Sequence, residues 1–554
     1  MWRSLFLDNK ENILDQLSKE SARLRALGEW RAALTVSFQL LEHAPDRAEV
    51  QHNLSVCLLA VGQAAQALHH AQLAIHIQPD LWQAHLVSGR ALRAMGQGHK
   101  AGKLLADLIT RFPDQPEIRL AFSEVALHEY SEARMARHIL SPLKHLPAYQ
   151  RDIALTSIIT QLYDRDIDGL SLSNQIRDFS ALYLSLPEQA DPHLNLVLGQ
   201  SNRLRVGFIS PQFFISPVYF FCIGAIKNLA QIHDLIFFHR GSKNDWATEE
   251  FKQLAILWFD AKPLNSEALA ELIKKQNLDV LLDLGGWMDP LALRALSTRP
   301  AKKQYKWVGG QSATTGLHAF DGFISDKYQS PVDTQKLYSE PLVLLDSGYV
   351  SYQPPSYLPQ TVQPNSACRT VGVISNPVKV SLSFLTELRL QALPLQHKSD
   401  QPVVLDFIDK RYQHGVVRQR ILNVLKPQNK EWPNNVKIRF IAPKDHKEYL
   451  QHVASLDWVI DTWPYTGGLT TMEALAMGVP CRTRIGQLFC ERHTYAHCRY
   501  AGLEQAQVDI EQLGMFEPYQ KITERNTILS VNSPRLNHQA VANALSAMIA
   551  SKSI

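Results

Sequence analysis

The chain has 554 residues, and its 57 lysines and arginines nearly balance 53 aspartates and glutamates, leaving a formal net charge of +4. So small a surplus in a well-mixed set of charges argues against a dedicated binder of nucleic acid or of membrane surfaces. At roughly 150 residues per domain, the length predicts three or four domains rather than one.

The apolar runs and the cysteines indicate the cellular compartment of the protein. The longest stretch worth testing, Pro217 to Ile226, is about half of the ~20 residues that a membrane-spanning helix needs. The first residues hold too short an apolar run for a secretory signal. The six cysteines include no Cys-x-x-Cys pair, which fits a reducing compartment without disulfides. We therefore expect a cytoplasmic protein with no membrane partner.

A repeat runs through the first part of the chain. Prolines recur 34 residues apart at Pro45, Pro79, Pro113 and Pro147, and glycines with the same period at Gly28, Gly62 and Gly96. Apolar stripes of helical period lie between them, and small residues stand where two helices would approach closely, at Ala33, Ala67 and Ala101. Each proline ends a helix because it cannot continue the hydrogen-bond ladder.

Two residue types in phase at one period resemble tetratricopeptide repeats, so residues 1–150 are predicted to form an α superhelix. The unit that starts near Pro116 is degenerate, since Tyr130 stands where glycine is expected. A generic helical bundle is the alternative. Each repeat leaves its concave face free, and we expect that face to bind peptides or to form a homodimer.

Strands alternate with helices further along the chain. Residues 151–203 are predicted to be a helical linker, with a junction marked by Pro187, Pro192 and Gly199–Asn202. Apolar runs that predict strands then cover 205–210, 235–238, 278–284, 370–374, 403–407, 436–440 and 458–461. This alternation is typical of parallel sheets covered on both faces. The proline-rich link from Pro354 to Pro364 separates two Rossmann-like lobes, 204–350 and 365–554, and tandem lobes of this kind indicate the α/β architecture of GT-B glycosyltransferases.

The sharpest motif follows the last of these strands. It reads Asp461-Thr-Trp-Pro-Tyr-Thr-Gly-Gly-Leu-Thr-Thr-Met-Glu-Ala-Leu-Ala-Met-Gly-Val-Pro480. Gly467 and Gly468 let the backbone approach a ligand, and a helix that begins at Thr470 and Thr471 offers unpaired N–H groups to phosphate oxygens. Glu473, in the first turn, is predicted to bind a ribose diol. The alternative is a plain N-cap made by the threonines.

The same motif closely resembles the donor-site signature of the O-GlcNAc transferase and SPINDLY family. Further family landmarks follow in the expected order: Leu204–Pro211, Leu282–Gly286, Arg299–Ala301, Thr314–Leu317, Asp321–Asp326 and Tyr338–Val343. The family also carries amino-terminal tetratricopeptide repeats. The resemblance therefore covers almost the whole chain.

The resemblance implies an inverting, metal-independent transfer of a sugar, with GlcNAc from UDP-GlcNAc first among the donors, to Ser or Thr of protein acceptors, and no cofactor besides that donor. UDP-glucose and GDP-fucose stay open because family members also use them. Lys379 matches the family lysine that contacts the diphosphate, with Asn376 beside it, and an ammonium there offsets the charge of the leaving group. Lys444 and His446 match the segment that contacts the base and ribose. Taken alone, Lys379 is equally a solvated surface lysine.

The sugar and acceptor region is marked by Ser216, Thr314, Thr315 and Gly316, and here the chain departs from its relatives. Gln212 and Ser216 stand where relatives carry Asp and His, Trp287 stands where His or Tyr is frequent, and Gln311–Ala313 replaces Tyr-Pro-Gly. An amide and a hydroxyl cannot replace a carboxylate and an imidazole, so no obvious general base remains at those positions. Proton removal assisted by phosphate or water, and a scaffold that has lost activity, both stay open.

A second constellation follows the donor motif. Cys490, His493 and His497 fall on one helical face and are ligand types of zinc. The alternative, favoured because the family needs no metal, is a helix beside the donor loop with Arg492, His493 or His497 near the nucleotide. The chain contains no Gly-x-Ser-x-Gly, Walker or Gly-x-Gly-x-x-Gly motif, so hydrolase, kinase and dehydrogenase functions lack support.

Overall fold

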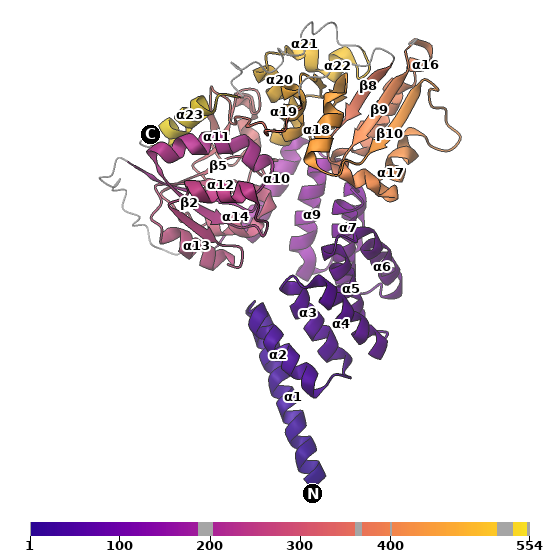
Figure 1. Cartoon of the computed structure of the whole chain (residues 1–554), viewed down its shortest axis with the longest axis vertical. Helices are drawn as coiled ribbons and strands as arrows, with labels where there is room; N and C mark the ends of the chain where they lie inside the picture. The colour runs from indigo at the N-terminus through magenta and orange to yellow at the C-terminus, as the bar shows by residue number, and fades with distance from the viewer. Residues whose placement is uncertain (1, 187–202, 360–367, 399–400, 518–535, 551–554) are drawn as a thin grey trace. The chain divides into compact units, whose positions relative to one another are not determined.

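The computed structural model describes residues 2–186, 203–359, 368–398, 401–517 and 536–550 of the chain. These residues divide into two compact units, 1–156 and 157–554 (Figure 1). Each unit is described by itself. None of the described helices has the length and apolar character that crossing a membrane requires.

The first unit consists of antiparallel helix pairs. Its helices are α1 (Trp2–Ala26), α2 (Trp30–His43), α3 (Ala48–Ala60), α4 (Ala64–Ile77), α5 (Trp82–Ala94), α6 (Gly98–Arg111), α7 (Pro116–His128) and α8 (Ala133–His138). The repeated glycines Gly28, Gly62 and Gly96 join two helices each and have φ of +76°, +87° and +74°, a backbone conformation that strains any other residue. The repeated alanines are fully buried between the helices. The predicted repeats are thus confirmed over α1 to α6.

The last predicted repeat is incomplete. Its second helix, α8, has only six residues, and Pro147 begins a short 3₁₀ helix, η2 (Pro147–Tyr149), instead of ending a helix. Another 3₁₀ turn, η1 (Ser141–Leu143), precedes it. Tyr130, which stands at the expected glycine, reaches Gly102 of α6, where an added Cβ would lie 2.0 Å from the tyrosine hydroxyl. The ring therefore fills the space that a regular helix pair would occupy.

The second unit contains two parallel sheets. The first has the order β3 (Leu257–Asp260), β2 (Asp234–His239), β1 (Arg205–Ser210), β4 (Val280–Asp283), β5 (Lys303–Lys306), β6 (Gly322–Ser325), β7 (Leu342–Leu344). The second has the order β10 (Val436–Ile441), β9 (Val403–Ile408), β8 (Arg369–Val373), β11 (Trp458–Ile460), β12 (Cys481–Arg482). In both sheets the strand order reverses beside the first strand, at β1/β4 and at β8/β11. Loops that leave the carboxyl ends of strands at such a reversal form ligand crevices.

Helices connect these strands. In the first lobe they are α11 (Pro217–Ile232), α12 (Trp246–Leu254), α13 (Ser266–Lys274), η4 (Gly286–Met288), α14 (Pro290–Leu296) and η5 (Val332–Leu337). In the second lobe they are η6 (Pro377–Lys379), α15 (Leu382–Ala392), α16 (Leu395–Lys398), η7 (Lys410–Gln413), α17 (Gly415–Leu425), α18 (His446–Ala454), α19 (Leu469–Ala476), η8 (Phe489–Glu491), α20 (His493–Tyr500), α21 (Gln505–Val508) and α22 (Ile510–Leu513). Apolar side chains of β8, β9 and β11 are buried between the helices, which gives this lobe its own core. The tandem α/β lobes expected from the sequence are confirmed.

Two segments depart from the expected domain bounds. After α9 (Gln150–Tyr163), the helix α10 (Gly169–Phe179) and the π-helical turn η3 (Ser180–Leu184) pack on η5 and α14 of the first lobe. They belong to that lobe and not to a separate linker. The last described helix, α23 (His538–Ala550), lies on α11 of the first lobe, although the sequence placed it in the second (Figure 1). The junction at Pro187, Pro192 and Gly199–Asn202 lies outside the described residues, as does the end of the proline-rich link.

Candidate active site

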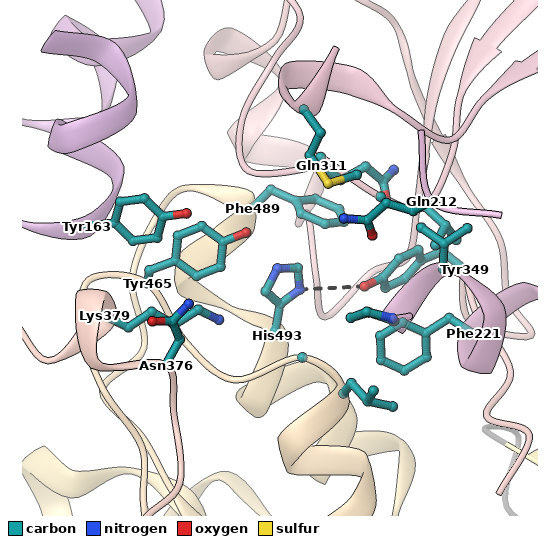
Figure 2. A pocket seen from close by; sticks show the side chains of 18 residues that line it. Tyr163, Gln212, Phe221, Gln311, Tyr349, Asn376, Lys379, Tyr465, Phe489 and His493 are labelled. Atoms are coloured by element: carbon teal, nitrogen blue, oxygen red, sulfur yellow. Dashed lines mark hydrogen bonds between the residues drawn. The ribbon is translucent and has the colours of Figure 1, made fainter. Parts of the chain in front are cut away.

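A cavity of about 350 Å³ lies at the carboxyl ends of the strands of both lobes. The first lobe contributes residues after β1, β4, β5 and β7, and the second contributes residues after β8, β11 and β12. Its polar lining side chains are Tyr163, Gln212, Gln311, Tyr349, Asn376, Lys379, Tyr465 and His493 (Figure 2). Three predicted donor residues, Asn376, Lys379 and Gly468, are therefore brought together in one cavity.

Lys379 is held at the end of η6, directly after β8. Asn376 begins that turn, and its side-chain oxygen accepts the Val378 N–H at 3.2 Å. The Lys379 ammonium donates to the Thr466 carbonyl at 2.9 Å and lies 4.1 Å from the centre of the Tyr465 ring. Burial lowers the pKa of Lys379 to about 8, although the nearby Asp461 carboxylate opposes the shift. An anion bound in the cavity would favour the charged ammonium.

Asp461 fixes the glycine loop that follows β11. Both of its carboxylate oxygens accept the Gly467 N–H at 3.0 Å, and one accepts the Thr462 N–H at 2.9 Å. The Thr494 hydroxyl donates to the same carboxylate. Burial raises the pKa of Asp461, while these hydrogen bonds act in the opposite direction. The loop is thereby fixed with Gly468 facing the cavity.

The close approach of this loop to α19 requires glycine at position 467. A Cβ there would lie 2.7 Å from the Thr471 hydroxyl and 2.8 Å from that of Thr470. The helix begins at Leu469, its N-cap is Gly468, and no side chain caps it. The alternative in which a threonine caps this helix is therefore wrong. The backbone N–H groups of the first turn have no capping side chain, and they lie beside the cavity.

The two threonines of this helix differ in their surroundings. Thr471 is buried, and its hydroxyl donates to the Gly467 carbonyl at 3.0 Å and lies 2.7 Å from the Thr494 hydroxyl. Thr470 is partly exposed. Glu473 lies beyond the first turn of α19, contrary to the expectation from sequence, because the helix starts one residue before Thr470. Thr471 therefore holds the loop, and of the predicted residues Gly467, Gly468, Thr470 and Thr471 it is Gly468 that lines the cavity.

Glu473 and His446, predicted separately, form one pair. His446 Nε2 lies 2.7 Å from a Glu473 carboxylate oxygen, and its Nδ1 lies 2.8 Å from the Tyr357 hydroxyl. Burial raises the pKa of Glu473, and the bond to His446 opposes that shift. Lys444 is exposed, and its backbone N–H donates to Glu448 at 2.8 Å. Glu473, His446 and Lys444 lie outside the residues that line the cavity.

The predicted sugar and acceptor residues lie inside the first lobe. The Thr314 hydroxyl donates to the buried Glu340 carboxylate at 2.6 Å, and the Thr315 N–H donates to it at 2.7 Å. Gly316 has φ +75°, and a Cβ there would lie 2.6 Å from the Ser180 hydroxyl. None of the three lines the cavity. The hydrogen bonds to Glu340 account for the burial of Thr314 and Thr315, and the close contact with Ser180 accounts for glycine at position 316.

Ser216 also has a structural task. It caps α11, its hydroxyl donates to the Gln212 carbonyl at 2.9 Å, and it does not line the cavity. Gln212, two residues after β1, does line it. Trp287 is buried, and its indole N–H donates to the Thr314 carbonyl at 2.9 Å. Of the departures noted in the sequence, Gln212 and Gln311 are those that face the cavity.

A buried lysine that the sequence did not single out supports the cavity wall after β5. The Lys306 ammonium lies 3.4 Å from the Asp283 carboxylate and donates to the Gly309 carbonyl at 2.6 Å. Asp283 in turn accepts the N–H groups of Gly285 and Gly286. Burial lowers the pKa of Lys306, and the Asp283 carboxylate opposes the shift. The sequence feature that could have pointed to Lys306 is the Asp-Leu-Gly-Gly landmark, because the carboxylate of a buried aspartate needs a cation near it.

His493 begins α20 and lines the cavity. Its Nδ1 lies 3.5 Å from the Tyr349 hydroxyl, and its ring meets the Phe489 ring edge to face with centroids 5.1 Å apart. Cys490 is buried, and burial raises the pKa of its thiol. Within the described part of the chain, no group of three His, Cys, Asp or Glu is placed to hold a metal ion. His493 is therefore a cavity-lining residue held between Tyr349 and Phe489.

Two parallel α/β lobes around one such cavity define the GT-B fold class. Residues 189–353 match the model of Glycosyl transferase family 41. The curated relatives include the probable UDP-N-acetylglucosamine–peptide N-acetylglucosaminyltransferase SPINDLY of Petunia hybrida, 26% identical over 335 residues that cover 58% of this chain and 34% of that protein. The SPINDLY protein of Arabidopsis thaliana is 28% identical over 297 residues, covering 51% and 31%. The chain is therefore similar to SPINDLY-like proteins, and part of its first lobe matches family 41.

The chain spans about a third of the length of these curated relatives. A solved structure with the same fold is an O-GlcNAc transferase mutant of Thermobaculum terrenum, with a TM-score of 0.61, 22% sequence identity and coverage of 98% of each chain. The fold class predicted from the sequence, helical repeats followed by GT-B lobes, agrees with this match.

Proposed function

We propose that this protein is a glycosyltransferase that moves a sugar from a nucleotide sugar to Ser or Thr hydroxyls of protein acceptors, with GlcNAc from UDP-GlcNAc as the donor. The observation that carries the proposal is the half-buried Lys379, whose ammonium shares a cavity with Gly468 at the start of α19. A fixed cation beside helix N–H groups is suited to a diphosphate. The names of the curated relatives, which specify UDP-N-acetylglucosamine and peptide, support this donor and acceptor.

The donor diphosphate is proposed to bind Lys379, Asn376 and the backbone at Gly468. As the glycosidic bond breaks, negative charge grows on the leaving diphosphate, and the ammonium and helix N–H groups stabilise it. Because these groups already supply positive charge, we propose that transfer needs neither a metal ion nor a cofactor. The nucleoside is proposed to lie toward His446, Glu473 and Lys444, with Thr470 beside the phosphates and Gly467 behind them.

Inversion at the anomeric carbon is part of the proposal. Retention by double displacement requires a carboxylate that forms a covalent intermediate with the sugar. The side chains that line the described cavity include no Asp or Glu. Direct displacement by the acceptor hydroxyl inverts the anomeric carbon and needs no such carboxylate.

The acceptor is proposed to be a peptide segment that binds the helical repeats and reaches the cavity. The fixed backbone turns at Gly28, Gly62 and Gly96 repeat the same helix pair, and stacked pairs present an extended concave surface. We further propose that this surface, where self-complementary, also pairs two copies of the chain.

The test begins with thermal stabilisation of the purified protein by UDP, GDP, UDP-GlcNAc, UDP-glucose and GDP-fucose, because a ligand that binds only the folded state raises the melting temperature. We expect UDP and UDP-GlcNAc to raise it, and Lys379→Ala to abolish the shift. Lys430→Ala, at an exposed lysine outside the cavity, is the matched control and should keep the shift. Transfer to an array of Ser- and Thr-containing peptides is then measured by mass spectrometry.

A scaffold without transferase activity is a second candidate, favoured by Gln212, which presents an amide to the cavity where the relatives' carboxylate is expected. This alternative predicts either no response to any nucleotide or a nucleotide shift without sugar transfer. Sugar transfer by the wild-type protein that is lost in Lys379→Ala would exclude it.

A further inference from the structure

The proposed reaction needs a group that accepts the proton of the acceptor hydroxyl. The places at which the family resemblance locates such a group hold Gln212 and Ser216, which cannot accept it. Gln212 faces the cavity with an amide, and Ser216 caps α11 with its hydroxyl turned to a carbonyl. The cavity must therefore supply the base from another element, if it supplies one.

Other titratable groups near the cavity are committed elsewhere. The Glu340 carboxylate accepts hydrogen bonds from Thr314 and Thr315, and Asp283 is bonded to Gly285, Gly286 and Lys306. The Lys379 ammonium is needed in its charged form beside the leaving diphosphate. Burial raises the pKa of the Tyr163 phenol to about 12 and that of Tyr465 further still, so neither is a base near neutral pH.

His493 is the imidazole among the residues that line this cavity. In Figure 2 its ring lies between Lys379 and Asn376 on one side and Gln212 and Tyr349 on the other. It comes from the second lobe, the same lobe as Lys379, and points toward the first. A sugar bound through its diphosphate at Lys379 would present its anomeric carbon to the region that this ring faces.

Thr466 is hydrogen-bonded to both His493 and Lys379. The Thr466 carbonyl accepts the Lys379 ammonium at 2.9 Å, while the Thr466 hydroxyl oxygen accepts the His493 backbone N–H at 3.0 Å. The Thr466 hydroxyl itself donates to the Cys490 carbonyl at 2.8 Å. Thr466 therefore ties the start of α20, which carries the imidazole, to the Lys379 ammonium, and a fixed spacing of this kind is what a base and a leaving-group stabiliser require to act on one substrate.

We propose that His493 is the catalytic base of the transfer, an assignment that rests on the proposed function. In one displacement step an imidazole nitrogen takes the proton of the acceptor hydroxyl, and the hydroxyl oxygen forms a bond to the anomeric carbon. The bond from that carbon to the β-phosphate oxygen breaks, and the electron pair leaves with the nucleoside diphosphate beside Lys379. The acceptor class that fits is a hydroxyl on an extended peptide. The Tyr349 hydroxyl, 3.5 Å from Nδ1, positions the ring.

The test compares His493→Gln and His493→Ala with His414→Gln, a control at a partly exposed histidine outside the cavity. Substitution leaves the backbone N–H bond to Thr466 in place, so we expect unchanged thermal stabilisation by UDP in all three. For a peptide that the wild-type protein modifies, we expect kcat to fall by roughly 10²–10⁴ in both His493 variants, which is the usual contribution of a general base. The KM for UDP-GlcNAc should stay within a few-fold of the wild type.

The pH profile separates chemistry from packing. The titratable groups in contact with the ring are Tyr349, Tyr465 and His497; Lys379 lines the same cavity, and Cys490 and Arg492 precede His493 in the chain. Wild-type kcat/KM should fall toward acid as His493 is protonated, and His493→Gln should lose this acidic limb while keeping an alkaline limb from Lys379. Added imidazole should restore part of the activity of His493→Ala.

The other possible results would overturn either the assignment of His493 or the proposed function. Transfer by His493→Gln at the wild-type rate, or a lower rate with the acidic limb intact, would overturn the assignment while leaving the proposed transferase standing. A wild-type protein that binds UDP but transfers no sugar to any peptide would overturn the proposed function, and the base with it. Loss of UDP stabilisation in His493→Gln would show that the ring binds donor, and would equally overturn the assignment.

Discussion

The two sides of the cavity follow their sequence motifs differently. On the second lobe, Lys379 and Gly468, two of the residues predicted for donor binding, line the cavity. On the first lobe, Thr314 and Thr315 are bonded to the buried Glu340, and it is Gln212 and Gln311 that face the cavity. The difference lies in what each motif does: the donor side presents backbone and an ammonium, whereas the first-lobe motif builds the wall behind the presented groups.

The match to the family model also differs between the two lobes. It covers residues 189–353, which is essentially the first lobe, while the sharpest local motif lies between Asp461 and Pro480 in the second. The first lobe thus matches the family model over most of its length, although Gln212 and Gln311 face the cavity at positions that depart from the family pattern. Substitutions can separate the residues that support the first lobe from those that contact a ligand.

Lys306→Met is expected to lower the free energy of unfolding by about 3–5 kcal/mol, because it leaves the buried Asp283 carboxylate without its cation. Denaturant unfolding of the full chain measures the loss when it is followed by tryptophan fluorescence in a background with Trp2, Trp30 and Trp82 replaced by Phe, so that the remaining tryptophans all lie in residues 157–554. Lys252→Met is the control, since Lys252 pairs with Glu249 at the surface and should cost less than about 1 kcal/mol.

Below its shifted unfolding transition, Lys306→Met should still bind UDP, because Lys379 and the glycine loop belong to the other lobe. Loss of UDP binding at a temperature where the variant is folded would contradict the division between the two sides.

How far the sequence predicted this fold depended on hydrophobic runs. The strands at 205–210 and 403–407 are continuous apolar segments and were predicted, whereas β5 reads Lys-Gln-Tyr-Lys and was missed. Its Lys306 is buried only because Asp283, far away in sequence, compensates the charge. Local pattern carries no information on that partner, so short parallel strands of this kind become visible only in three dimensions.

The site was predictable to the same extent. Lys379 and Gly468 follow strands within recognisable motifs, and both line the cavity. Tyr163 and Tyr349, by contrast, come from a helix before the first sheet and from the segment after its last strand, and their contacts with Tyr465 and His493 arise only through folding. His493 itself was noticed as a potential ligand of metal or neighbour of the nucleotide, but its place opposite Gln212 required the structure.

The donor side should also show its own pH dependence. Because the pKa of Lys379 is lowered to about 8 in the empty cavity, the lysine loses its proton as the pH rises through that value. A bound diphosphate favours the ammonium, so the Kd of UDP should be nearly constant below about pH 7 and increase about tenfold between pH 7 and pH 9.

Calorimetric titration of UDP across this range measures the effect. Lys379→Arg is the matched variant, because a guanidinium stays protonated throughout, and its Kd should be independent of pH. A wild-type Kd that does not change with pH would mean that Lys379 is not the group that binds the phosphates.

The smallest effect concerns the threonines of the two motifs. Thr315→Val removes a hydroxyl that donates to Glu340 and accepts the Leu317 N–H at 3.2 Å. We expect a loss of about 1 kcal/mol in unfolding free energy, with the KM for UDP-GlcNAc and kcat unchanged. Thr470→Val, on the partly exposed face at the start of α19, should do the opposite: unfolding is unchanged and the KM increases a few-fold. If Thr315→Val instead lowers kcat at unchanged stability, the first-lobe motif contacts the sugar after all, and the two sides of the cavity would be alike.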